Sequence, residues 1–142
     1  TVGHSSGGYV ATALAEQRPE LVRSLALIST GPRTADLLPQ PFILRALLAP
    51  PLGPLIWSIR TDGTIRKGLS ATAARPVDLP GETIAGIRAI TYRTMRSVLR
   101  CNTAYIDARS VPERLAALTT PVLVIFGGAD RRWDPSSARG FW

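Results

Sequence analysis

Near its first residue the chain carries a glycine- and serine-rich segment, Gly3-His4-Ser5-Ser6-Gly7-Gly8, which contains the pattern Gly-x-Ser-x-Gly. This pattern is typical of a sharp turn from a strand into a helix, where small residues are needed two positions before and two after the serine because the backbones nearly touch. Val2 can end the strand, and apolar residues recur at helical spacing from Tyr9 to Leu14. The sequence therefore predicts that Ser5 lies on a tight strand–turn–helix junction.

A serine on such a junction is well placed for nucleophilic attack, because the start of the following helix offers free N–H groups and a partial positive charge. Ser5 is the candidate nucleophile, and the backbone N–H of Ser6 is the candidate donor to an oxyanion. An ordinary glycine–serine turn is the alternative. His4 is the only histidine, but its side chain points elsewhere in a tight turn, so we expect it to be structural rather than a catalytic base.

Two apolar runs predict buried parallel strands, at residues 22–28 and 121–126. Pro19 ends the first helix, and a short amphipathic helix over 111–118 precedes the second strand. Alternating strands and helices of this kind predict an α/β fold.

The region between these runs, residues 33–110, contains no convincing strand. A helix over 37–48 is interrupted by prolines, and a better one is predicted over 81–100, with arginines on the face opposite its apolar positions. This region therefore has the character of a helical insertion.

The net charge of +7 raises the possibility of a nucleic-acid partner. The arginines are dispersed, however, and their densest group lies along the predicted 81–100 helix without a nucleic-acid-binding motif. A solvated helix face is therefore preferred.

The apolar runs are too short to cross a bilayer and no secretory segment is visible, which favours a cytoplasmic protein without a membrane partner. The single cysteine, Cys101, excludes an internal disulfide and is expected to be a small buried residue.

Three aspartates compete for the role of a catalytic acid. Asp130 lies four residues after the second strand, and functional groups gather at the carboxyl edge of a parallel sheet. Asp134 precedes Pro135 and is suited to be a helix N-cap, whereas Asp107 lies in the helical insertion. Asp130 is therefore preferred, with Asp134 as the main alternative.

The stretches Val2–Gly8, Gln17–Ile28 and Pro121–Asp130 resemble the α/β-hydrolase superfamily, in its branch of lid-bearing, esterase-like enzymes. The resemblance implies a partial α/β-hydrolase fold with Ser5 as nucleophile, Asp130 as acid, a helical lid, and no metal or organic cofactor. It also implies a catalytic histidine downstream of the acid, which this chain does not contain. Serine at the turn argues against the related dehalogenase and epoxide hydrolase branches, which use aspartate there.

The resemblance divides the chain into a core segment over 1–32, a lid over 33–110 and a second core segment over 111–142. Both ends fall inside expected elements, so the chain is expected to be an incomplete internal fragment of a hydrolase. An apolar pocket under the lid could be lined by Phe42, Leu44, Trp57, Tyr92 and Met95. Ordinary packing between lid helices is the alternative for each of these side chains.

The function that follows is a serine hydrolase acting on a small, apolar ester or related acyl substrate through a Ser-His-Asp triad. Carbon–carbon bond hydrolysis, acyl transfer and perhydrolysis use the same triad, so the fold alone does not select among them. A non-catalytic or truncated hydrolase-like binding protein is the alternative from another class.

Overall fold

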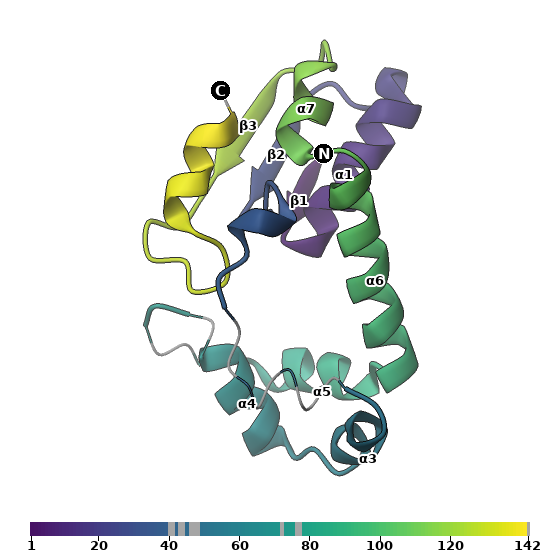
Figure 1. Cartoon of the computed structure of the whole chain (residues 1–142), viewed down its shortest axis with the longest axis vertical. Helices are drawn as coiled ribbons and strands as arrows, with labels where there is room; N and C mark the ends of the chain where they lie inside the picture. Colours follow the sequence, from purple (N-terminus) through teal and green to yellow (C-terminus); the bar gives the residue numbers. More distant parts are fainter. Residues whose placement is uncertain (40–41, 43–44, 46–48, 72, 76–77, 142) are drawn as a thin grey trace. The chain divides into compact units, whose positions relative to one another are not determined.

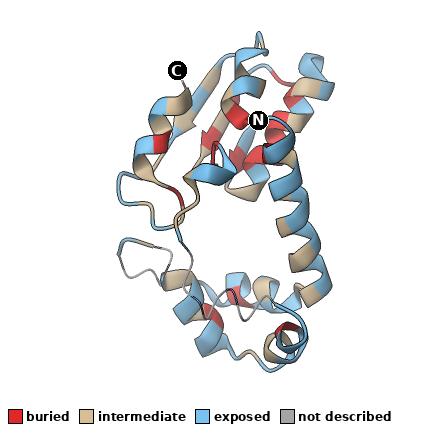
Figure 2. Ribbon diagram, viewed as in Figure 1, coloured by how far each residue is buried: buried red, intermediate tan, exposed pale blue. Residues whose placement is uncertain are grey.

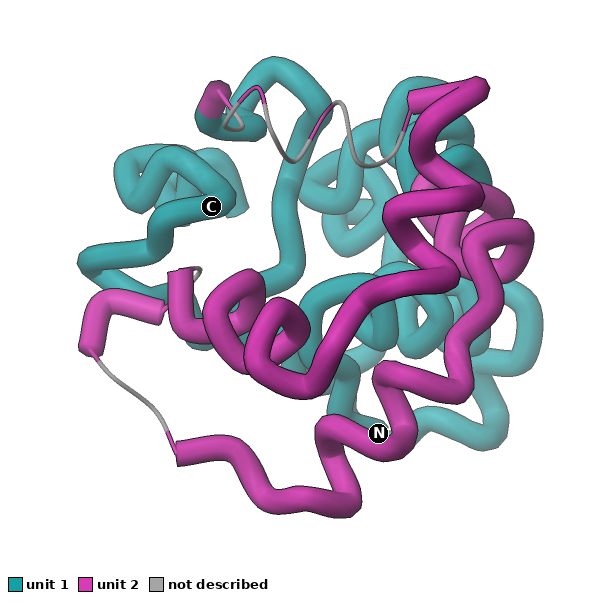
Figure 3. The backbone as a smooth tube through the Cα atoms, turned by 90° about the horizontal axis from the view of Figure 1, so that it is seen from below, with its two compact units in different colours: residues 1–38, 100–142 teal, residues 39–99 magenta. Residues whose placement is uncertain are grey.

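The computed structural model describes residues 1–39, 42, 45, 49–71, 73–75 and 78–141. These residues form two compact units, one made of 1–38 with 100–142 and the other of 39–99 (Figure 3). Most of the helix expected over 37–48 lies outside the described residues.

The first unit is built on a parallel sheet with the strand order β1-β2-β3 (Figure 1). The strands are β1 (Val2–His4), β2 (Leu25–Ile28) and β3 (Val122–Ile125). The predicted α/β class is confirmed. β2 begins three residues later than expected. It follows the 3-10 turn η1 (Pro19–Leu21), which the Val22 N–H closes on the Pro19 carbonyl at 3.1 Å.

The two faces of this sheet differ in how well they are covered. Leu25 and Leu27 are fully buried and belong to a core cluster shared with α1 (Ser6–Gln17) and α7 (Val111–Ala116). Figure 2 colours the buried parts of the chain red. The opposite face carries three strongly exposed apolar side chains: Val2 (70%), Leu123 (59%) and Ile125 (47%). Within the described residues, the expectation of strands covered on both faces is therefore wrong for one face.

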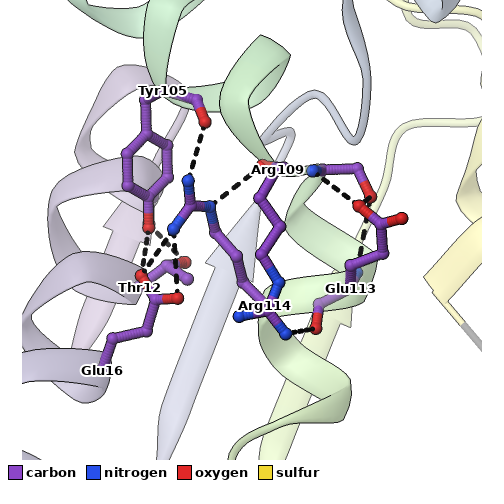
Figure 4. A network of polar contacts seen from close by, with 8 residues as sticks. Thr12, Glu16, Tyr105, Arg109, Glu113 and Arg114 are labelled. Atoms are coloured by element: carbon purple, nitrogen blue, oxygen red, sulfur yellow. Dashed lines mark hydrogen bonds and ion pairs between the residues drawn. The ribbon is translucent and has the colours of Figure 1, made fainter.

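A polar network joins three helices of this unit, α1, α7 and the last turns of α6 (Tyr92–Ala108) (Figure 4). Glu16 accepts hydrogen bonds from the Tyr105 hydroxyl at 2.8 Å and from Arg114 Nη1 at 3.1 Å. The Arg114 guanidinium also lies 3.8 Å from the centre of the Tyr105 ring. Burial and the neighbouring Glu16 carboxylate raise the pKa of Tyr105. Each charge is thus paired where it is partly removed from water.

The second unit contains α3 (Leu52–Ser58), α4 (Asp62–Ser70), α5 (Gly81–Ala89) and the first turns of α6. Arg60 connects these helices, because its guanidinium donates to the carbonyl of Trp57 in α3 and to those of Ile87, Arg88 and Ile90 at the end of α5. A charged side chain thus links α3 to the end of α5 in this unit.

The prediction of one helix over 81–100 is wrong, since α5 ends at Ala89 and α6 begins at Tyr92. Ile90 has an extended backbone, with φ −68° and ψ 121°. The Thr91 hydroxyl accepts the N–H of Thr94 at 3.0 Å, which caps a new helix. Thr91 therefore marks the start of a new helix.

One smaller expectation fails and another is met. Cys101 is exposed, because the side chains of α6 that contact α1 in this region are those of Asn102 and Tyr105. A helix does begin after Asp134, as expected; it is the 3-10 helix η3 (Pro135–Phe141). No helix in the described part of the chain has both the length and the apolar character needed to cross a membrane.

Candidate active site

Ser5 lies between the end of β1 and the start of α1, with φ 51° and ψ −122°. A positive φ is uncommon for a residue with a side chain, and it marks a backbone that the surrounding structure must enforce. The Ser5 N–H donates to the Ile28 carbonyl at 2.9 Å, which anchors the turn to β2. The strand, the turn and the helix thus meet at this serine.

Close backbone approach explains one of the two glycines of the motif. A Cβ added at Gly3 would lie 2.6 Å from both the Gly7 carbonyl oxygen and the Gly8 Cα. A Cβ at Gly7 would meet nothing within 4 Å, whereas one at Gly8 would lie 1.9 Å from Thr30 Oγ1. Among the described residues, close approach therefore requires a small residue three positions after the serine, at Gly8, and not two positions after it as expected.

Thr30 is a contributor that sequence reasoning missed. It is 1% exposed, and its hydroxyl donates to the Ser5 carbonyl at 3.2 Å while filling the space beside Gly8. The preceding residue, Ser29, also has a positive φ, of 46°. The sequence signal for Thr30 was its place in a Ser-Thr-Gly-Pro segment after a strand. That signal predicts a turn and not a contact with Ser5.

The start of α1 leaves N–H groups available next to Ser5. The Gly8 N–H donates to the Ser5 carbonyl at 2.9 Å, whereas the Ser6 N–H has no acceptor within the described residues. The Ser6 hydroxyl accepts a hydrogen bond from Asn102 Nδ2 at 2.7 Å. The backbone N–H of Ser6 is thus free to bind a negatively charged oxygen close to Ser5.

The three candidate acids all make local hydrogen bonds. Asp130 follows β3 and is half-buried; its Oδ1 accepts the N–H groups of Arg132 at 2.7 Å and Trp133 at 3.0 Å. Asp134 accepts the N–H of Ser136 at 2.8 Å, and this bond lowers the pKa of Asp134.

Asp107 is exposed and accepts the Thr34 hydroxyl at 2.5 Å. Of the three aspartates, only Asp130 lies in the turn that directly follows a strand of the sheet.

His4 is exposed at the end of β1. Side chains alternate along a strand, so His4 lies on the same sheet face as Val2 and opposite to the buried Gly3. Within the described residues, no group of three His, Cys, Asp or Glu side chains could bind a metal ion.

The candidate pocket residues belong to the second unit. The Trp57 and Tyr92 rings meet edge to face with centroids 6.4 Å apart, and Trp57 Nε1 donates to the Ile90 carbonyl at 2.9 Å. Met95 is half-buried, whereas Phe42 is 82% exposed. Leu44 lies outside the described residues. A role in substrate binding stays a prediction for all of them.

The sequence of this chain was compared with those of known proteins. The sequence is 33% identical over 145 residues to a pimeloyl-[acyl-carrier protein] methyl ester esterase of Neisseria meningitidis serogroup A, covering 94% of this chain and 43% of that protein. A serogroup C protein with the same name is 32% identical, with 94% and 52% covered. The chain spans about half the length of the curated relatives it matches.

Two solved structures share the fold. One is described as a membrane phospholipase A and bacterial virulence factor, with a TM-score of 0.56, 23% identity, and 99% of this chain and 44% of that chain covered. The other is an α/β hydrolase from Sphaerobacter thermophilus DSM 20745, with a TM-score of 0.50, 20% identity, and 99% and 53% covered. At these identities the likeness concerns the fold alone.

The sequence also matches the family described as serine aminopeptidase, S33, over residues 1–142. The chain therefore belongs to the S33 serine aminopeptidase family and has the fold of part of an α/β hydrolase.

Proposed function

We propose that Ser5 is the nucleophile of a serine hydrolase that cleaves an ester or related acyl substrate. The observation that carries this proposal is the backbone of Ser5, with φ 51° and ψ −122° on a strand-to-helix turn. A positive φ at a serine costs conformational energy, and such strain is concentrated at functional sites. The nucleophile elbow of α/β hydrolases has this arrangement.

Attack of Ser5 Oγ on a carbonyl carbon would form a tetrahedral intermediate with a negatively charged oxygen. The Ser6 N–H, which lacks an acceptor among the described residues, would donate to that oxygen. Because Ser6 is the first residue of α1, the partial positive charge of the helix start would add to this stabilisation.

Asp130 would orient a histidine and stabilise its charged form. Ser5 follows β1 and Asp130 follows β3, with β2 between them. Two strand spacings amount to about 10 Å, which leaves space for an imidazole ring between the two side chains. His4 lies on the exposed sheet face beside Val2, so we propose that this histidine comes from outside residues 1–142.

Two readings of the substrate follow from the relatives. The Neisseria proteins are named methyl ester esterases, which favours a carboxylic ester. The family description, serine aminopeptidase, favours an amide next to a free amino group. The ester is preferred because those relatives are 32–33% identical over nearly the whole chain. In either case we propose residues 33–110 as a lid whose apolar side chains, including Trp57 and Tyr92, contact the acyl part.

The test is hydrolysis of a p-nitrophenyl ester and of an aminoacyl p-nitroanilide by the complete polypeptide that contains residues 1–142. Ser5→Ala should lower kcat by about 10⁴-fold or more, as removal of a triad serine does. Ser97→Ala, at an exposed serine of α6, is the matched control and should leave kcat unchanged. Ester hydrolysis that survives Ser5→Ala would refute the proposal, and a preference for the anilide would favour the peptidase reading.

The acid is tested in the same assay by two isosteric variants. Asp130→Asn should lower kcat by about 10⁴-fold, because the histidine would be left in the wrong tautomer. Asp134→Asn should have little effect on kcat, because its carboxylate caps η3. The reverse result would assign the acid to Asp134.

A further inference from the structure

We infer that Asn102 is a positioning residue for the oxyanion site, acting through the side chain of Ser6. The inference deepens the proposed function and rests on it. Asn102 Nδ2 donates to Ser6 Oγ at 2.7 Å, across 96 positions of sequence. Both residues belong to the same compact unit and both are half-buried.

Contacts made by the next turn of α6 fix the position of Asn102 against α1. Three residues further along α6, the Tyr105 ring packs against Tyr9 with centroids 6.0 Å apart. The Tyr105 hydroxyl donates to Glu16 at 2.8 Å, and Ile106 is buried in the core. Asn102 therefore meets Ser6 from a helix whose packing is already determined.

The hydrogen bond matters because Ser6 is the first residue of α1. A serine hydroxyl at the start of a helix can accept hydrogen bonds from nearby backbone N–H groups, and so competes with any other acceptor for them. In the proposed reaction those N–H groups, above all that of Ser6, bind the oxyanion. Ser6 Oγ has two lone pairs, but its bond to Asn102 holds the side chain in a rotamer in which it accepts no backbone N–H of the described residues. Asn102 thereby leaves those N–H groups for the intermediate.

Asparagine is among the weaker helix formers, and Asn102 lies well inside α6. Its place there is not explained by helix propensity. It is explained by the bond to Ser6, which only a side chain with a donor at this length can make.

Two substitutions should change kcat in opposite directions, which a role of Asn102 in packing alone would not produce. Asn102→Ala frees the Ser6 hydroxyl, so kcat for ester hydrolysis should fall about tenfold with little change in KM. The loss is smaller than the 10²–10³ for removing an oxyanion donor, because the N–H is diverted and not deleted. Ser6→Ala removes the competing hydroxyl, so the double variant should recover to within about threefold of wild type.

The experiment measures kcat and KM for a p-nitrophenyl ester with the complete polypeptide containing residues 1–142, in wild type, Asn102→Ala, Ser6→Ala and the double variant. Inhibition by a trifluoromethyl ketone, which forms a tetrahedral adduct, should weaken in parallel with kcat. Melting temperatures of the four proteins identify losses due to unfolding. If Asn102→Ala is unstable, Asn102→Leu, of nearly the same size but without a donor, takes its place.

The outcomes are distinct. Activity that Ser5→Ala leaves intact would refute the proposed function itself. Ser5-dependent activity that is unchanged in Asn102→Ala, or lost there and not restored by Ser6→Ala, would overturn the role of Asn102 and leave the proposed function standing.

Discussion

The two compact units of this chain are stabilised in different ways. In the unit made of 1–38 and 100–142, nine buried hydrophobic residues form one cluster. In the described part of 39–99, only two hydrophobic residues, Ile65 and Ile84, are buried to the same degree. There the Arg60 guanidinium, which donates to the carbonyls of Ile87, Arg88 and Ile90, adds polar contacts between segments. The unit that carries Ser5 thus has the larger buried apolar cluster, and we expect the other unit to rely more on the hydrogen bonds of Arg60.

The largest effect is expected where two backbones touch in the first unit. Gly3→Ala would place a Cβ 2.6 Å from backbone atoms of Gly7 and Gly8, so it should destabilise the protein by about 3 kcal/mol or more. Gly7→Ala is the matched control, because its Cβ would meet nothing within 4 Å and alanine favours the helix. Urea unfolding of both variants measures the difference; equal stabilities would contradict the account of the turn.

A second, smaller loss is expected at the network shown in Figure 4. Arg114→Met keeps the length of the side chain but removes its bonds to Glu16 and to the Tyr105 carbonyl. Because these groups are partly buried, unfolding should become easier by about 2 kcal/mol. Arg18→Met, at an ion pair in which both side chains are well exposed, is the control and should change stability by less than about 1 kcal/mol. A loss at Arg18 as large as that at Arg114 would show that burial does not set the difference.

Local opening should distinguish the units directly. Arg60→Met removes donors to three carbonyls at the end of α5, so backbone amides of α3 and α5 should exchange with solvent faster. Amides of β2, at the centre of the sheet, should keep their protection. Hydrogen exchange followed by mass spectrometry measures both. Faster exchange in β2 as well would mean that the two units unfold as one.

The last expected effect is a dependence of stability on alkaline pH. Burial raises the pKa of Tyr9 to about 12, against about 10 in an unfolded chain. Between these values the unfolded tyrosine is ionised and the folded one is not, so stability should fall as pH rises from about 10 to 12. Tyr9→Phe should make this fall shallower in thermal melts. An unchanged slope would show that Tyr9 does not contribute to it.

The local structure around Ser5 could be predicted from sequence because its causes are local. Glycine at position 3 and a helical pattern after Ser6 are sufficient to indicate a strand, a turn and a helix. The exposed position of Cys101 could not be obtained in the same way, since it depends on which face of α6 packs on α1.

Other features required knowledge of distant contacts. The break between α5 and α6 lies where Thr91 caps α6. The carbonyl of the preceding residue, Ile90, accepts hydrogen bonds from the side chains of Trp57 and Arg60. The close approach at Gly8 depends on Thr30, 22 positions away. The local sequence pattern predicts neither the helix break nor the close approach at Gly8, because both depend on contacts between distant segments. The capping box of Ser110 and Glu113, by contrast, joins residues only three positions apart.

The central claim, that Ser5 is an activated nucleophile, is tested most directly by covalent labelling. A fluorophosphonate reacts with activated serines, and peptide mapping by mass spectrometry locates the adduct. With the complete polypeptide containing residues 1–142, we expect one adduct on Ser5, slower labelling in Asp130→Asn, and unchanged labelling in Asp134→Asn and Ser97→Ala. An adduct on a different serine, or labelling that continues undiminished in Ser5→Ala, would contradict the account.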